Sequence, residues 1–171
     1  SVVGQNLIVE VRGREPAHVL AVLNQYPMDR IENGFRLRVG DLFGDEQREI
    51  FAEFLVPCLP ELGPRQIGNV VVELDQVVDP VSHHRFERPL DINVVATEEA
   101  PAAADPQVHL PATLLRISDV RKTLIELIER GQFDDAQQKL DETRRTYEAH
   151  GPLPLELQRE FESIARELQQ A

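Results

Sequence analysis

The spacing of apolar residues changes part-way along the chain, and this change limits the fold more than any other feature. Up to Ala96, apolar residues recur at every second position, which sends successive side chains to opposite faces of a β-strand. After Asp105 they recur at every third or fourth position, the period of an amphipathic helix. We therefore predict an α+β protein with a β-sandwich domain over residues 1–97, a linker over 98–106 and an α-helical tail over 107–171.

The stretch Gly34–Pro57 carries the clearest alternation and predicts a β-hairpin. Its first half alternates apolar residues with arginines, and its second half alternates across residues 50–56. The residues between the halves that favour a turn are Gly40, Asp41, Gly44 and Asp45. We expect two antiparallel strands joined by a loop of about seven or eight residues, with Leu42 and Phe43 at its tip.

Four other segments complete the predicted β domain. Asn6–Arg12, Gln66–Leu74 and Arg85–Ala96 alternate as strands, whereas His18–Gln25 fits either a strand or a short helix. Asp75–His84 contains Asp-Pro and predicts a turn or an irregular link. Five or six strands without intervening helices favour an antiparallel sandwich. Because the chain has no Trp and a single Cys, we expect an immunoglobulin-like architecture and not an immunoglobulin domain proper.

Local signals mark the ends of three predicted helices. Asp105 is a good N-cap residue, and Pro106 follows it at the first helical position. The first helix should end near Gly131, since glycine readily takes the left-handed conformation at a helix end. A second helix should end before Gly151, and Pro154 can open a third. The tail is therefore expected to form a helical hairpin or a three-helix unit.

The segment Gly131–Leu140 supports an alternative function for the tail. Its glycine, aromatic, alanine and leucine spacing is that of a corner in a tetratricopeptide-type hairpin. A repeat array needs at least three copies, and the sequence contains one. We therefore favour a generic αα-hairpin, and keep as an alternative a helical adaptor that binds a peptide or another chain.

Composition and charge argue against several classes of partner. The chain has 30 acidic and 18 basic residues and a net charge of −12, which would repel a nucleic-acid backbone. No apolar run is long enough to span a membrane, and Ser1 is not followed by the basic region of a signal peptide. A start at Ser suggests a processed or excised piece. The compartment stays open, with the cytoplasm slightly favoured.

No residues predict a catalytic, cofactor or metal site. Cys58 has no local base and is expected to be inert and partly buried. His83 and His84 are adjacent on an expected strand or loop, so they should point apart. Asp41–Glu46 resembles a calcium loop only superficially, because apolar residues interrupt its ligands.

Motifs for phosphate binding, serine hydrolysis and zinc proteolysis do not occur in the sequence. An unrecognised enzyme would need two carboxylates in one pocket, at least one with a raised pKa. We predict a non-enzymatic chain without a cofactor.

Four apolar residues of the predicted hairpin are candidates for contact with a partner protein. They are Leu42 and Phe43 at the tip, and Phe51 and Leu55 on the second strand. One face of each strand in a sandwich meets the core, and Phe51 and Leu55 lie on the opposite face from Ile50. Something must therefore cover them. The helical tail is the nearest candidate, and a partner protein is the other.

Three stretches resemble the region that follows the von Willebrand factor A domain in a group of bacterial proteins. They are SVVGQNLIVEVR, RLRVGDLFGDEQREIFAEFLVP and VVVELDQVVDPVSHHRFERPLDINVV. In those proteins a β-sandwich follows the last helix of the A domain and carries a Leu/Val-Gly-Asp-Leu hairpin, similar to Val39–Leu42 here. A helical tail with an Arg-Gly pattern, like Arg130 and Gly131, comes next. The resemblance covers residues 1–140.

The resemblance implies an accessory module for protein–protein interaction or scaffolding. Its expected partner is an A domain in the same chain, upstream of Ser1, and any other protein partner is left open. The A domain binds metal through an Asp-x-Ser-x-Ser motif, which this sequence lacks, and Asp79–Ser82 does not match it. Metal ligands of the A-domain type are therefore not expected here.

Overall fold

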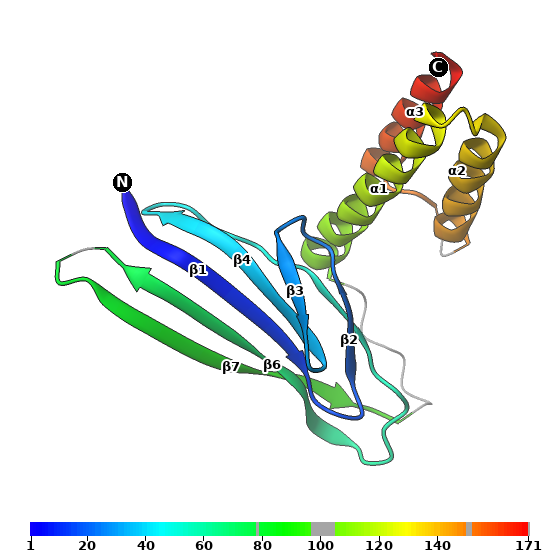
Figure 1. The fold of residues 1–171 in the computed structure, drawn as a ribbon. Helices are drawn as coiled ribbons and strands as arrows, with labels where there is room; N and C mark the ends of the chain where they lie inside the picture. The colour runs from blue at the N-terminus through cyan, green and yellow to red at the C-terminus, as the bar shows by residue number, and fades with distance from the viewer. Residues whose placement is uncertain (78, 97–104, 150–151, 171) are drawn as a thin grey trace. The chain divides into compact units, whose positions relative to one another are not determined.

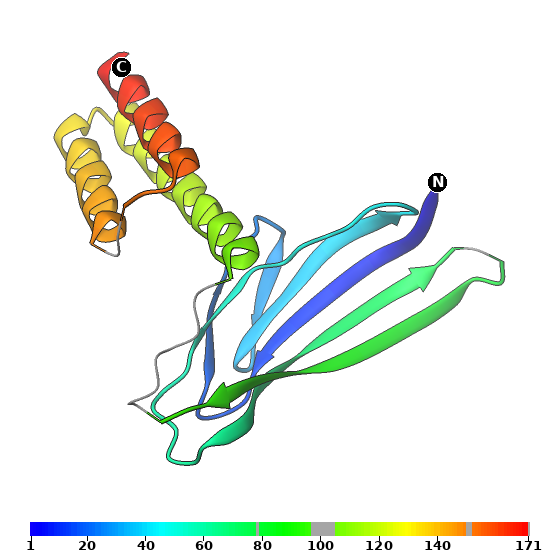
Figure 2. The same ribbon diagram turned by 180° about the vertical axis from the view of Figure 1, so that it is seen from behind.

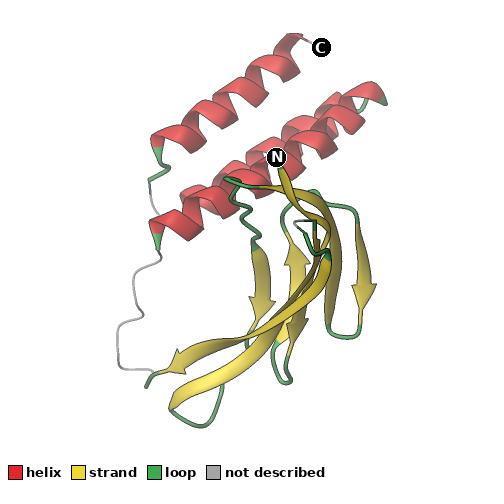
Figure 3. Ribbon diagram, turned by 90° about the vertical axis from the view of Figure 1, so that its left-hand side faces the viewer, coloured by secondary structure: helices red, strands yellow, loops and turns green. Residues whose placement is uncertain are grey.

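The computed structural model describes residues 1–77, 79–96, 105–149 and 152–170. The chain divides into two compact units, one up to Ala103 and the other from Ala104. In the described residues the first unit, called the sheet unit below, holds antiparallel β-sheets, and the second, the helical unit, holds three α-helices (Figures 1 and 3). The predicted α+β class is confirmed. Most of the predicted linker, residues 98–104, lies outside the described residues.

The described strands form one large and one small antiparallel sheet. The large sheet has five strands in the order β3-β4-β1-β6-β7, and the small sheet pairs β2 with β5. The bounds are β1 Val2–Gly13, β2 His18–Val22, β3 Met28–Ile31, β4 Gly34–Phe43, β5 Ala52–Leu55, β6 Gly63–Gln76 and β7 Ser82–Val94. Figure 2 shows the same arrangement from behind, with β6 and β7 forming one long ribbon at the margin of the large sheet.

The strands predicted at Asn6–Arg12 and Gln66–Leu74 are confirmed within the longer β1 and β6. The ambiguous segment His18–Gln25 contains a strand. The irregular link predicted at Asp75–His84 is too long, because β6 continues to Gln76 and β7 already begins at Ser82. The charged residues in this segment hid the strand ends.

The predicted Gly34–Pro57 hairpin is wrong. β4 pairs with β1 on one side and with β3 on the other, so neither edge remains for β5, which pairs with β2. The true hairpin joins β3 to β4 through Asn33, whose φ of 48° lies in the left-handed region that Asn tolerates. β3 was missed because four residues without alternation give no signal.

The helical unit follows the local signals closely. Its helices are α1 Pro106–Glu129, α2 Phe133–Glu148 and α3 Leu155–Gln170. The carboxylate of Asp105 accepts a hydrogen bond of 2.9 Å from a backbone N–H of the first turn. At the other end of α1, Gly131 has a φ of 73° and donates to the carbonyl of Ile128, while Gln132 donates to that of Leu127. These two bonds form a Schellman cap.

All three helices contribute to one closed core. Its buried members are each at most 4% exposed, and they are Ile117, Leu124, Ala136, Leu140, Leu157, Phe161 and Ile164. At the edge of this core, the guanidinium of Arg121 bonds Glu160 at 2.7 Å and Glu167 at 2.5 Å. These two ion pairs link α1 to α3.

The two faces of the five-stranded sheet differ in chemistry. The inner face carries the apolar core, whose buried residues are Leu7, Val9, Val11, Leu37 and Val39, joined by Val19 of β2. The outer face carries a ladder of ion pairs across four strands. Arg36 contacts Glu10 at 3.0 Å and Glu73 at 4.0 Å, and Arg85 contacts Glu73 at 3.3 Å. Because these charged side chains pair with one another and can meet water, the outer face needs no further layer to cover it.

Candidate functional site

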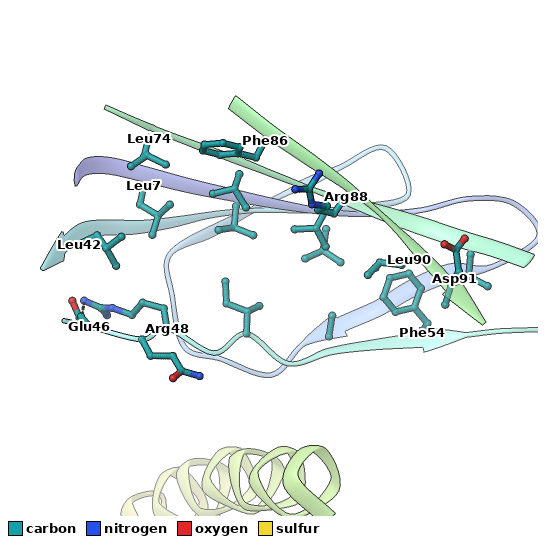
Figure 4. Close-up of a pocket in the computed structure, with 18 residues that line it drawn as sticks. Leu7, Leu42, Glu46, Arg48, Phe54, Leu74, Phe86, Arg88, Leu90 and Asp91 are labelled. Atoms are coloured by element: carbon teal, nitrogen blue, oxygen red, sulfur yellow. Dashed lines mark ion pairs between the residues drawn. The ribbon is translucent and has the colours of Figure 1, made fainter. Parts of the chain in front are cut away.

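An open apolar cleft of about 980 Å³ lies inside the sheet unit. One wall is the inner face of β1, β6 and β7, and the other is formed by residues 46–54 (Figure 4). Side chains on β6 and β7 that line it include Val70, Val72, Leu74, Phe86 and Leu90. They come from alternate positions of neighbouring strands, so the pleat of the sheet places them on one face.

The cleft is open because the small sheet is too narrow to cover the large one. β2 contacts β4 and β1, and its Val19 is buried there. Beyond β5 no described residue forms a further strand over β6 and β7. Val70 and Val72 are consequently only partly buried, and Phe86 is 50% exposed. A contiguous apolar surface of this kind commonly marks an interaction site.

Arg48 lies at one end of the cleft, in a network of its own. Its guanidinium contacts Glu46 at 2.6 Å and the hydroxyl of Tyr26 at 3.4 Å. The hydrogen bond to Tyr26, and then that to Glu46, raises the pKa of Arg48, so the group stays charged. Although the side chain is 29% exposed, its Nε–H is covered and has no hydrogen-bond partner among the described residues.

Arg88 is the cation on the β7 wall of the cleft. It sits between Phe86 and Leu90 in the alternation of β7, on the inner face (Figure 4). Within the described residues it makes no hydrogen bond or ion pair. By contrast, Arg85 on the outer face bonds Glu73 and Glu87. Asp91 also lines the cleft, near Leu90. Arg88 is therefore a charge available to an occupant of the cleft.

The structure places only one of the four predicted contact residues in the cleft. Leu42 lines it and packs on the core. Phe43 is 48% exposed at the end of β4, opposite Val2, and not at a hairpin tip. Phe51 is partly buried, and Leu55 is 53% exposed on β5. Contact of these residues with a partner stays a prediction, as does their cover by the helical tail.

Strands were predicted at Gln66–Leu74 and Arg85–Ala96, but their shared apolar face was not identified as a candidate site. A signal was present, because Arg88 interrupts an apolar alternation that includes Phe86, Leu90 and Ile92. A charged residue at a predicted core position indicates either a buried pair or an open face. The sequence does not tell these apart, because the outcome depends on how far the small sheet extends.

The other candidates show no converging chemistry. In the described ranges no three His, Cys, Asp or Glu side chains are placed to share a metal ion. His83 bonds Asp75 at 2.8 Å, and His84 bonds Ser82 at 2.9 Å, so the two imidazoles have different partners. Cys58 is exposed, and the prediction that it is partly buried is wrong. No described helix has the length and hydropathy to cross a membrane.

Comparisons of the chain with protein-family models, with curated proteins and with solved structures found no match. The interpretation of the cleft therefore rests on its own residues.

Proposed function

We propose that this chain is a non-enzymatic interaction module whose sheet unit, an open immunoglobulin-like sandwich, receives part of a partner protein in its cleft. The observation that supports this is the apolar inner face of β6 and β7, over which no described strand lies. Burial of such a surface contributes about 25 cal/mol per Å² of apolar area, which makes a covering partner favourable. The polar groups of the cleft are few and do not form a reactive pair.

The partner we propose is the von Willebrand factor A domain that the sequence resemblance implies upstream of Ser1. The three stretches that carry the resemblance all contribute to the cleft. Leu7 comes from the first, Ile50 from the second and Val72 from the third. The cleft is thus built from the part of the chain that looks like an A-domain neighbour.

A second candidate is the helical adaptor, in which the helical unit binds a peptide or another chain. It is favoured by a groove of about 730 Å³ in that unit, lined by Leu110, Tyr147 and Leu157 among others. Under this hypothesis the sheet unit is only a support, and binding should depend on the groove and not on the cleft.

Calorimetric titration of the 171-residue chain with the A domain, with and without magnesium, tests these proposals. We expect saturable binding that Phe86→Ser in the cleft weakens and Leu110→Ser in the helical groove leaves unchanged. Both positions are at least partly exposed, so we expect both variants to fold, and circular dichroism can check this. The reverse pattern would favour the adaptor. Absence of heat from two folded samples, or a parent reading frame without an A domain, would overturn the proposed partner.

A further inference from the structure

One margin of the cleft is an unused backbone edge. The N–H of Phe51 donates to Oδ1 of Asn24 at 2.7 Å, and its carbonyl accepts from the N–H of Leu23 at 2.8 Å. The carbonyl of Glu49 also accepts from Asn24. Residues 49 and 51 therefore point their backbone groups toward the β2 side, as alternate residues of an extended strand do. The groups of Ile50 then point the other way, and no described residue bonds them.

The space beside this edge is long enough for an extended segment of several residues. The β6 wall runs from Ile67 to Leu74, which at about 3.3 Å per residue spans about 23 Å. An extended segment of about seven residues covers that length and carries backbone groups that can pair with those of Ile50. An α-helix uses its backbone groups internally, so it would leave the groups of Ile50 unpaired.

The chemistry of the cleft also limits its occupant. An occupant that covers Phe86 and Leu90 also lies against Arg88, which is exposed and makes no ion pair with a described residue, so a carboxylate placed there would gain a charge-assisted hydrogen bond. The occupant should therefore carry a carboxylate. A fatty acid would supply the carboxylate, but it would cover the backbone groups of Ile50 without bonding them, which is costly. A polypeptide strand satisfies both groups.

We propose that the cleft is a strand-acceptor site. An extended segment of the partner protein pairs with the backbone edge at Ile50, lies beside the β2–β5 sheet and packs alternate apolar side chains on β6 and β7. A carboxylate of the segment meets Arg88. This is recognition by strand addition, in which backbone bonds give affinity and side-chain pockets give specificity. It rests on the proposed function and adds to it the conformation and chemistry of the partner segment.

Amide hydrogen exchange, measured by NMR on the whole chain with and without saturating A domain, tests the pairing directly. We expect exchange at Ile50 to slow by about 100-fold on binding, because its N–H gains a partner. The amide of Phe51 already donates to Asn24 and serves as the internal control. Calorimetric binding with unchanged exchange at Ile50 would overturn strand addition and leave the docking function standing. Absence of binding would overturn both.

Charge reversal tests the carboxylate. Arg88→Glu should weaken A-domain binding by at least about tenfold, because it places like charges together under a covered surface. Arg85→Glu makes the same charge change on the outer face of the same strand and should alter affinity less than about twofold. Equal effects of the two variants would contradict the proposal, and a carboxylate→Lys change in the partner segment should restore binding to Arg88→Glu.

Two further experiments test for other occupants of the cleft. Saturable binding of oleate that is lost in Arg88→Glu, without A-domain protection of Ile50, would make the cleft a lipid site and the proposal wrong. Slowed exchange at Ile50 that appears on raising the concentration of the chain alone, with a dimer in the ultracentrifuge, would assign the edge to a second copy. We expect neither result.

Discussion

The helical unit and the sheet unit close their hydrophobic cores to different degrees. In the helical unit each of the three helices buries core residues, and Ile117 is 0% exposed. In the sheet unit the buried members of the core cluster come from β1, β2 and β4, whereas β6 and β7 contribute side chains such as Val72 that are only partly buried. Three amphipathic helices can each turn a stripe inward, but a small sheet of two strands leaves part of a five-strand face open.

This difference in core burial favours the sheet unit as the one that meets a partner. The outer face of the large sheet carries ion pairs around Glu10 and Glu73 and needs no cover. The inner face over β6 and β7 carries mainly apolar side chains, and the charged residues of these strands that line the cleft are Arg88 and Asp91. The inner face over β6 and β7 is thus the incompletely buried face of the large sheet, and the proposed partner segment would lie there.

The largest effect expected from this comparison is the difference between two Phe→Ala substitutions. Phe161 is 3% exposed in the helical core, and Phe161→Ala should cost about 3–5 kcal/mol through the cavity it leaves. Phe86→Ala should cost less than about 1 kcal/mol, because half of that side chain already meets water. Urea unfolding monitored by circular dichroism measures both. Similar losses would mean that β7 is covered in the free chain.

A smaller effect is expected on the outer face. The side chain of Glu10 is 8% exposed and bonds Arg12 and Arg36. Glu10→Gln should lower the free energy of unfolding of the sheet unit by about 1–3 kcal/mol, since hydrogen bonds to charged groups are lost at a covered site. Glu87→Gln removes an exposed pair and should cost about 0–1 kcal/mol. Equal losses of stability in Glu10→Gln and Glu87→Gln would contradict the idea that the covered ion pairs of Glu10 stabilise the outer face.

The smallest effect concerns pH. Hydrogen bonds from Asn6, and then from His83, lower the pKa of Asp75 below its ordinary value of 3.8. A depressed folded pKa contributes stability that is present above the unfolded pKa and lost as the pH falls through the folded pKa. Asn6→Gly keeps the left-handed backbone, where φ is 54°, and removes the first bond. The Asp75 pKa measured by NMR should then rise toward 3.8, and an unchanged value would contradict this.

The parts of this fold that local chemistry determines could be predicted, and the parts that depend on distant pairing could not. Asp105 and Gly131 mark the ends of α1 through groups within a few residues. β4 and β5 were found by alternation, but alternation does not identify a strand's partner. The hairpin over Gly34–Pro57 was therefore assigned to neighbours in sequence, whereas β4 lies between β1 and β3.

The candidate site, too, could be predicted only where local sequence determines it. Leu42 was predicted as a contact residue and does line the cleft, although it lies within a strand and not at a loop tip. Phe43, Phe51 and Leu55 do not line it. Arg88 was not singled out, because its importance depends on the fact that no described strand covers β7, and no local pattern encodes this.

Thermal unfolding of the whole chain with and without the A domain tests the central claim most directly. A ligand that binds only the folded sheet unit stabilises that unit, by about 2.7 kcal/mol at 100 times its Kd. We predict that the transition of the sheet unit, followed through the NMR signals of Val72 and Leu37, moves to higher temperature while that of the helical unit, followed through Ile117, stays in place. A shift confined to the helical unit, or no shift at saturation, would contradict the account.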